Sequence, residues 1–187
     1  VSEGMNSMNM NGIDISNHQS GMDLEKVLKE TNTDFVIVKA SEGLTFVDKY
    51  CDKFYQTAKK KGCSLGFYHF ARPELNSAKS EAEFFCKNTE GYFGKAIPVL
   101  DWESSGKKNV AWAKEWLDLV YKKTGVKPVI YMSESVVNAY NWKAVADAGY
   151  GLWVAKYRDY NVDRNYDMST AGKKPVVKWW KFYMMWQ

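Results

Sequence analysis

The fold is decided by one short stretch, Phe35-Val36-Ile37-Val38-Lys39-Ala40, in which β-branched and other apolar residues follow one another almost without interruption. A strand with one face in water alternates apolar and polar residues, whereas a strand covered on both faces is apolar nearly throughout. We therefore predict a buried strand at residues 35–40, covered on both of its faces.

Strand-like and helix-like segments alternate on both sides of this stretch. Further strands are predicted at 12–16, 65–70, 96–100, 128–132, 152–155 and 176–186. Apolar residues at helical spacing predict helices at 24–28, 48–61, 77–87, 109–123 and 134–140. Such alternation implies a parallel sheet, and six or more units without a nucleotide-binding fingerprint favour a barrel over an open sheet. A full eight-fold barrel takes about 250 residues, so this chain of 187 residues predicts an α/β fold with a reduced barrel whose late helices are missing or vestigial.

Composition indicates where the folded domain begins and which kinds of ligand it can bind. Residues 1–10 are rich in Ser, Asn and Met and predict a flexible leader, which leaves 11–187 as the folded domain. The net charge is +4, and basic residues are scattered apart from Lys59-Lys60-Lys61, so no stripe predicts nucleic-acid binding. A mildly basic surface suits an anionic polymer. No apolar stretch approaches the length of a membrane span, and we expect no membrane insertion.

The cysteines and the first residues bear on the compartment. Cys51, Cys63 and Cys86 are an odd number without metal-ligand or CxxC spacing, so we expect free thiols, which are more usual outside oxidising compartments. Residues 1–10 lack the charged start and apolar run of a signal peptide. For a target outside a membrane, the expectation is release from the cytoplasm by another device, or processing from a longer precursor.

Polar side chains stand at the ends of most predicted strands. The five polar strand ends are Asp14-Ile15-Ser16, Lys39-Ala40-Ser41-Glu42, Tyr68-His69-Phe70, Asp101-Trp102-Glu103 and Tyr131-Met132-Ser133. One such end could be polar only because strand ends lie near the surface. Five ends carrying carboxylates, a lysine and tyrosines favour a shared cleft, since the chemistry of β/α barrels sits at the carboxyl ends of the strands.

Asp101 and Glu103 form the sharpest element. Side chains two positions apart in a strand face the same way, about 6.6 Å apart, while Trp102 faces the helices. Two like charges at this separation raise the pKa of one member, which gives the acid and the carboxylate that cleavage of a glycosidic bond requires. Taken alone, Asp14 is as compatible with a loop-capping role as with a catalytic one.

Other chemistries are less well supported. Only two histidines are present, without metal-ligand spacing, so no metal and no cofactor is predicted, although all-oxygen coordination of Mg²⁺ or Ca²⁺ stays open. His69 is expected to be a satisfied core residue, and His18 a loop or rim residue. The GxSxG elbow of serine hydrolases and phosphate-binding glycine loops are missing from the sequence.

Five motifs in this order resemble the glycoside hydrolase family 25 lysozymes, the muramidases of bacteria, fungi and phages. The motifs are Gly12-Ile13-Asp14-Ile15-Ser16 with His18-Gln19, Lys39-Ala40-Ser41-Glu42-Gly43, Gly66-Phe67-Tyr68-His69-Phe70, Asp101-Trp102-Glu103, and Trp153-Val154-Ala155-Lys156-Tyr157. The resemblance runs from about residue 11 to the C-terminus and implies a flattened, incomplete (β/α) TIM-like barrel. It also implies cleavage of the β-1,4 bond between N-acetylmuramic acid and N-acetylglucosamine in peptidoglycan.

The resemblance also implies roles for individual residues. Glu103 becomes the general acid and Asp101 its partner, which orients the acetamido group of the substrate in one of the mechanisms proposed for the family. Asp14 supports the charge arrangement or the bound sugar. The residues implied to line the substrate cleft are Glu42, Tyr68, Tyr131 and Trp153.

The sequence departs from the family pattern after Trp186-Gln187. Family members continue with a further loop and a strand that supplies another acid. The expectation is therefore either a shortened or incomplete sequence or a domain without its last barrel strand. Two alternatives to a muramidase stay open: a glycan-binding relative without activity, and a hydrolase of another amino-sugar polymer such as chitin. The expected partner is the glycan strand of the bacterial wall, reached in the manner of a phage endolysin.

Overall fold

The computed structural model describes residues 9–159 and 172–187. Its strands are β1 (Gly12–Ile15), β2 (Phe35–Glu42), β3 (Phe46–Val47), β4 (Ser64–Phe70), β5 (Ile97–Asp101), β6 (Val129–Ser133), β7 (Gly151–Ala155) and β8 (Met185–Trp186). Its α-helices are α1 (Leu24–Glu30), α2 (Cys51–Lys60), α3 (Ala78–Thr89), α4 (Val110–Thr124), α5 (Glu134–Ala139) and α6 (Lys143–Asp147), with short 3-10 helices at Asn17–Gln19 and Glu90–Tyr92.

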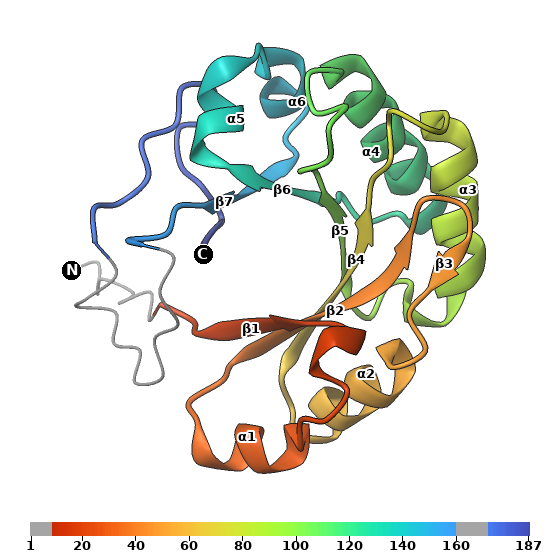
Figure 1. Cartoon of the computed structure of the whole chain (residues 1–187), viewed down its shortest axis with the longest axis vertical. Coiled ribbons are helices and arrows are strands. Elements are labelled where there is room, and N and C mark those ends of the chain that lie inside the picture. Colours follow the sequence, from red (N-terminus) through yellow and green to blue (C-terminus); the bar gives the residue numbers. More distant parts are fainter. Residues whose placement is uncertain (1–8, 160–171) are drawn as a thin grey trace, which may run out of the picture.

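The strands form one curled sheet in the order β1-β2-β4-β5-β6-β7-β8. Neighbours in this order are parallel, and β3 adds an antiparallel hairpin to β2. Figure 1 shows the sheet as an arc with the helices outside it and an opening between β1 and β7. The predicted α/β fold with a flattened, incomplete barrel is confirmed.

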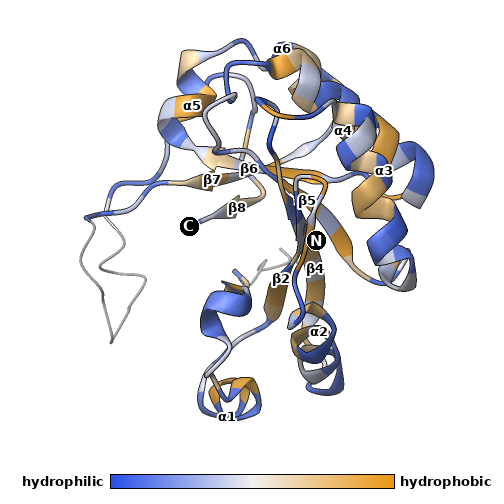
Figure 2. Ribbon diagram, turned by 45° about the vertical axis from the view of Figure 1, so that its right-hand side comes forward, coloured by the Kyte–Doolittle hydropathy of each residue, from blue (hydrophilic) through white to orange (hydrophobic). Residues whose placement is uncertain are grey.

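Apolar side chains pack on both faces of the sheet. Ile37, Val99, Val129 and Trp153 cluster on the concave face, while a larger core lies between the strands and the helices. The largest buried side chains of that outer core are Trp102, Trp116, Trp142, Tyr55, Phe54, Phe67 and Phe85. In Figure 2 the strands are largely orange, while the helices carry both orange and blue residues. Because burial of one large apolar side chain contributes about 1.5–3 kcal/mol, this double-sided core explains the uninterrupted apolar run of β2.

The predicted helix boundaries have clear local causes. Asp23 caps α1 by accepting a hydrogen bond from the backbone N–H of Lys26, at 3.1 Å. Asn109 does the same for α4, which ends at Gly125 with a φ of 73°. Glycine adopts this left-handed backbone conformation at little cost in free energy, so the long helix ends at the position that the sequence indicates.

The C-terminal segment differs from the prediction. A strand over 176–186 was expected, but only Met185 and Trp186 pair with β7, and residues 172–184 are irregular. The apolar residues of this segment pack against the helical layer instead, and the indole N–H of Trp179 donates to the Tyr140 carbonyl at 2.7 Å. The short helix α6 was not predicted. The late helices are reduced as expected, since α5 has 6 residues and α6 has 5.

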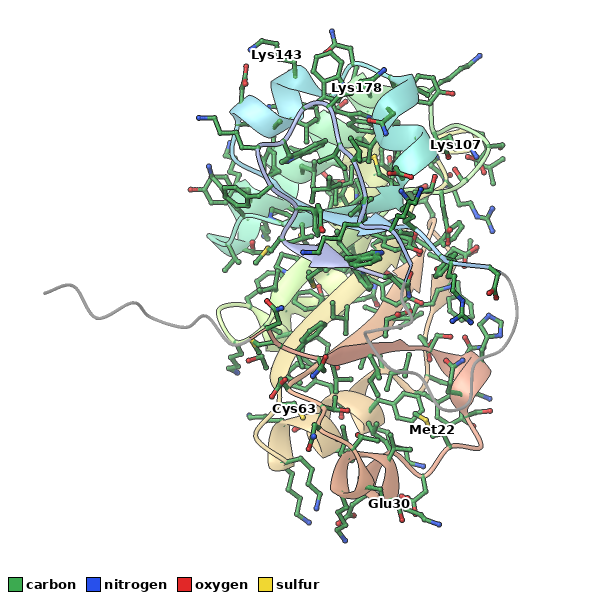
Figure 3. All side chains as sticks on the ribbon, turned by 90° about the vertical axis from the view of Figure 1, so that its left-hand side faces the viewer. Met22, Glu30, Cys63, Lys107, Lys143 and Lys178 are labelled. Carbon is green, nitrogen blue, oxygen red and sulfur yellow. The ribbon has the colours of Figure 1, made fainter. Side chains whose placement is uncertain are left out.

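Three further expectations concern the surface and the thiols. The three cysteines are free, as predicted, with Cys51 and Cys86 buried. Figure 3 shows Cys63 in the lower half of the molecule, and Lys143 and Glu30 at its opposite outer ends. None of the helices in residues 9–159 and 172–187 is long and apolar enough to cross a membrane. The predicted leader lies outside the described residues except for its last two positions.

Candidate active site

Three carboxylates meet in one cavity at the carboxyl ends of the strands. The cavity has a volume of about 220 Å³ and is lined by Asp14, Tyr68, Val99, Asp101, Glu103, Tyr131, Trp153, Tyr157 and Gln187. Asp14 comes from β1 and Asp101 from β5, so the curl of the sheet brings together residues from opposite parts of the chain. Six of the seven predicted site residues lie here.

Asp101 and Glu103 owe their common direction to extended backbone. Asp101 is the last residue of β5, and the extended pairing continues because the backbone N–H of Trp102 donates to the Tyr131 carbonyl at 2.9 Å. Trp102 faces the helices, where it is buried and its indole N–H donates to the Lys107 carbonyl at 2.9 Å. This anchor fixes the backbone between the two acids.

The environments of the two acids are unequal. Asp101 is buried and Glu103 is exposed. Burial, followed by the charge of Glu103, raises the pKa of Asp101 well above its ordinary range, while the nearby ammonium of Lys39 lowers it. The spacing predicted one raised pKa in the pair, and Asp101 has a raised pKa. Its Oδ1 is buried without a hydrogen-bond partner among the described residues.

Asp14 faces the pair from the other edge of the sheet. Its carboxylate is open to the solvent of the cavity but has protein on most sides, and this desolvation raises its pKa. The side-chain amide of Gln187 donates to Asp14 Oδ2 at 2.5 Å and favours the ionised form. Glu103 acts in the opposite sense through its charge.

Aromatic rings form much of the remaining wall. Tyr131 and Trp153 stand edge to face with ring centroids 4.7 Å apart, and Tyr68 lines the cavity beside them. Burial raises the pKa of Tyr68 and of Tyr131, so both remain neutral phenols. Neutral rings with polar tips suit a sugar, which presents both apolar faces and hydroxyl groups.

Glu42 is the predicted site residue that the cavity does not include. Its Oε2 accepts a hydrogen bond from Lys39 Nζ at 2.6 Å, and its Oε1 accepts one from Arg72 Nε at 2.9 Å. Both carboxylate oxygens are therefore engaged in ion pairs. This arrangement gives Glu42 a part in holding β2 and the loop after β4 together.

The two histidines take the places expected of them. His69 is fully buried, with Nδ1 2.8 Å from Ser41 Oγ and Nε2 2.8 Å from Glu81 Oε2. Although the trio has the residue types of a catalytic triad, it lies on the helix side of β4 and away from the cavity. His18 is exposed on the 3-10 helix after β1 and is not among the residues that line the cavity.

The residue-level reasoning missed Tyr157 and Gln187. Tyr157 ends the last of the five motifs, and its hydroxyl donates to Gln187 Oε1 at 2.7 Å. Gln187 follows β8, whose short length gave no periodic signal. Within the described residues, no group of three or more His, Cys, Asp or Glu side chains has the arrangement of a metal site.

Comparison with known proteins agrees with this geometry. The family model "Glycosyl hydrolases family 25" matches residues 13–187. The chain is similar to the uncharacterized protein YegX of Escherichia coli K12, with 32% identity over 167 residues, 85% of this chain and 60% of that protein. It is also similar to the lysozyme of Streptococcus phage Cp-9, with 28% identity, 91% of this chain and 50% of that protein.

Among solved structures, a family GH25 lysozyme from Aspergillus fumigatus superposes with a TM-score of 0.73 and 27% identity, covering 94% of this chain and 85% of that one. The chain spans 60% of the length of the first curated relatives that it matches. With a family model matched over nearly its whole length, this chain belongs to glycosyl hydrolases family 25.

Proposed function

We propose that residues 11–187 form a muramidase domain that hydrolyses the β-1,4 bond between N-acetylmuramic acid and N-acetylglucosamine in peptidoglycan. The observation that carries this proposal is the meeting of Asp101, Glu103 and Asp14 in one solvent-open cavity walled by tyrosines and a tryptophan. Family membership and the names of the relatives, which include lysozymes and muramidases, support it.

The reaction uses one proton held by the Asp101–Glu103 pair. Before a sugar binds, the buried Asp101 holds it, because burial and the charge of Glu103 raise the pKa of Asp101. Glu103 is exposed in the cavity and can reach the glycosidic oxygen, whereas Asp101 lies deeper. When a sugar binds, Asp101 passes its proton to Glu103, and the carboxylate that remains at the cavity wall accepts a hydrogen bond from the acetamido N–H. Glu103 then protonates the leaving oxygen as the bond to the anomeric carbon breaks.

Two routes complete the reaction from this point. In the first, the acetamido oxygen attacks the anomeric carbon, and water opens the resulting ring with net retention, giving its proton to the Glu103 carboxylate. In the second, water attacks from the opposite face with net inversion, giving its proton to a carboxylate. NMR of the first-formed sugar separates the routes, since it reports the anomeric configuration before mutarotation.

The proposed partner is the glycan strand of the bacterial wall, and nucleic acid is not a proposed ligand. We further propose that the protein reaches the wall as endolysins do, through a route supplied by another component. The proposed substrate and the mildly basic charge of +4 support the first statement. The similarity to a phage lysozyme and to an endolysin supports the second.

The test is digestion of purified cell walls with wild-type protein, with Glu103→Gln and with the matched control Glu83→Gln. Glu83 is an exposed acid on α3, with 70% of its side chain accessible. Wild type and Glu83→Gln should release muropeptides with new reducing ends, and Glu103→Gln should be at least about 100-fold slower. Mass spectrometry of the products identifies the bond. If the protein binds walls but releases no new reducing ends, it is a glycan-binding protein without this activity. If it cleaves only chitin oligomers, its substrate is a different amino-sugar polymer.

A further inference from the structure

A side-chain hydrogen bond joins the two edges of the open sheet. β1 and β8 stand at opposite ends of the strand order, and Gln187, directly after β8, reaches Asp14 of β1. The backbone of Gln187 is fixed on both sides: its N–H donates to the Val154 carbonyl at 3.0 Å, and its carbonyl accepts from the Lys156 N–H at 2.8 Å. The amide therefore enters the cavity from a defined position.

Every lone pair of the Gln187 amide oxygen is used. Oε1 accepts the hydroxyl hydrogens of Tyr131 and Tyr157, each at 2.7 Å. A phenol has one hydrogen to donate. The two hydroxyl oxygens also lie 3.2 Å from each other. Both hydrogens are therefore used within the cluster of Gln187, Tyr131 and Tyr157, and toward the cavity the hydroxyls present lone pairs.

The amide has one favourable orientation while Asp14 is ionised. Turning it over would set Oε1 against the Asp14 carboxylate and would set the NH₂ group against two hydroxyls. Since an amide donates only through nitrogen, the charge on Asp14 and the direction of the two hydroxyls are coupled through this single side chain.

We infer that Gln187 is a positioning residue, which holds Asp14 as a carboxylate in the cleft and makes Tyr131 and Tyr157 acceptors for N–H or O–H groups of the bound sugar. The inference rests on the proposed function, because it deepens that same site. An N-acetylated sugar supplies both kinds of donor, so the arrangement favours it over a ligand that presents only acceptors. The titratable groups that face Asp14 from the surrounding elements are Glu103, Asp101, Tyr68 and Tyr157.

The first test needs no catalytic activity. ¹³C NMR of Asp-labelled protein follows the Asp14 carboxyl through a pH titration, and ¹⁵N NMR follows the side-chain amide of Gln187. In wild type both should titrate with the same midpoint. Gln187→Glu removes the donor and adds a negative charge, so the Asp14 midpoint should rise by about one pH unit. Equal Asp14 midpoints in the two proteins, or a Gln187 amide that is indifferent to that titration, would overturn the inference.

The second test separates the two roles by kinetics on solubilised glycan strands. Gln187→Glu still accepts both hydroxyls, so KM should stay within about two-fold, while the acidic limb of kcat/KM moves to higher pH with Asp14. Gln187→Met loses both roles, and its KM should rise as well. Tyr157→Phe, a change at an exposed ring, should raise KM about 2–10-fold, the value of one neutral hydrogen bond, and should leave the Asp14 midpoint unchanged.

The outcomes distinguish this inference from the proposed function. An inactive wild-type protein whose Asp14 and Gln187 titrate together keeps the coupling and removes the muramidase. An active wild-type protein in which Gln187→Met keeps its KM and pH profile removes the positioning role alone. Should Gln187→Glu not fold, the wild-type titration and Tyr157→Phe still decide the question.

Discussion

Lys39 and Glu42 form an ion pair with 2.6 Å between Nζ and Oε2, although residues three apart in a regular strand project from opposite faces. The register between β2 and β4 shifts between Lys39 and Ser41, which marks a bulge. The extra residue turns Glu42 to the face of Lys39. A cation is thereby held beside Asp101, whose pKa it lowers.

Replacing Lys39 should weaken the fold. Lys39→Met leaves the partly buried Glu42 carboxylate with only Arg72, so we expect the free energy of unfolding to fall by about 2 kcal/mol. This is less than for a fully buried pair, since 23% of the Glu42 side chain is accessible to water. Urea denaturation measures the change. The double variant Lys39→Met with Glu42→Gln should recover part of the loss, and strict additivity of the two changes would contradict the pairing.

The bulge also shows where prediction from sequence stops. Hydrophobic periodicity places β2 and β5 correctly because burial on two faces leaves a direct imprint on residue type. The same periodicity places Asp101 and Glu103 on one side of their strand. A one-residue bulge leaves no such imprint, so the shared face of Lys39 and Glu42 was not predicted. Glu42 was expected to line the cleft from the family resemblance, and its carboxylate contacts Lys39 and Arg72 instead.

The contact between Gln187 and Asp14 could not be predicted from the sequence either. Gln187 contacts Asp14 across 173 positions, and that contact depends on the curl of the whole sheet rather than on any local pattern. The segment before β8 was predicted wrongly for a related reason. Tryptophan-rich runs favour strands, yet the indole of Trp179 donates to the Tyr140 carbonyl after α5 and that of Trp180 to the Tyr150 carbonyl before β7. The helices with N-caps were the easier part, because the cap and the apolar stripe are local.

His69 should make folding stability depend on pH. Burial lowers its pKa below the ordinary value of about 6.5, so the folded state keeps it neutral where the unfolded chain binds a proton. Its contribution is therefore complete above about pH 6.5 and is lost as the pH falls below it. We expect wild type to lose about 1 kcal/mol more than His69→Gln between pH 7.5 and pH 5.5 in urea denaturation.

The comparison between the two proteins isolates the histidine. Asp101 acts in the opposite sense, since its raised pKa favours proton uptake by the folded state at low pH, but it is common to both. Parallel pH dependences for wild type and His69→Gln would show that the Ser41–His69–Glu81 hydrogen bonds do not hold a neutral imidazole.

Glu103→Gln should change the titration of its neighbour. The charge of Glu103 is the second cause of the raised pKa of Asp101, after burial. Without that charge we expect Asp101 to titrate about one pH unit lower, while burial keeps its pKa above the ordinary range. ¹³C NMR of the Asp carboxyl groups follows this directly. The control Glu83→Gln should leave Asp101 where it is, and an Asp101 midpoint that ignores Glu103 would refute the shared proton.

Trp180 should stabilise the pairing of β8 with β7. Its indole N–H donates to the Tyr150 carbonyl at 2.8 Å, and this bond ties residues 172–187 to the start of β7. Trp180→Phe leaves that carbonyl unpaired at a cost of about 1 kcal/mol. Exchange of the Met184 and Gln187 amides, which donate to carbonyls of β7, should therefore quicken about five-fold relative to the rest of the sheet. Because Gln187 directly follows this strand and lines the cavity, a less stable strand should also lower the rate of muropeptide release. As a control, Trp112→Phe removes a comparable indole hydrogen bond, to the Asn76 carbonyl, and should leave amide exchange at β8 unchanged. Equal effects of the two variants on that exchange would show that Trp180 does not specifically stabilise β8.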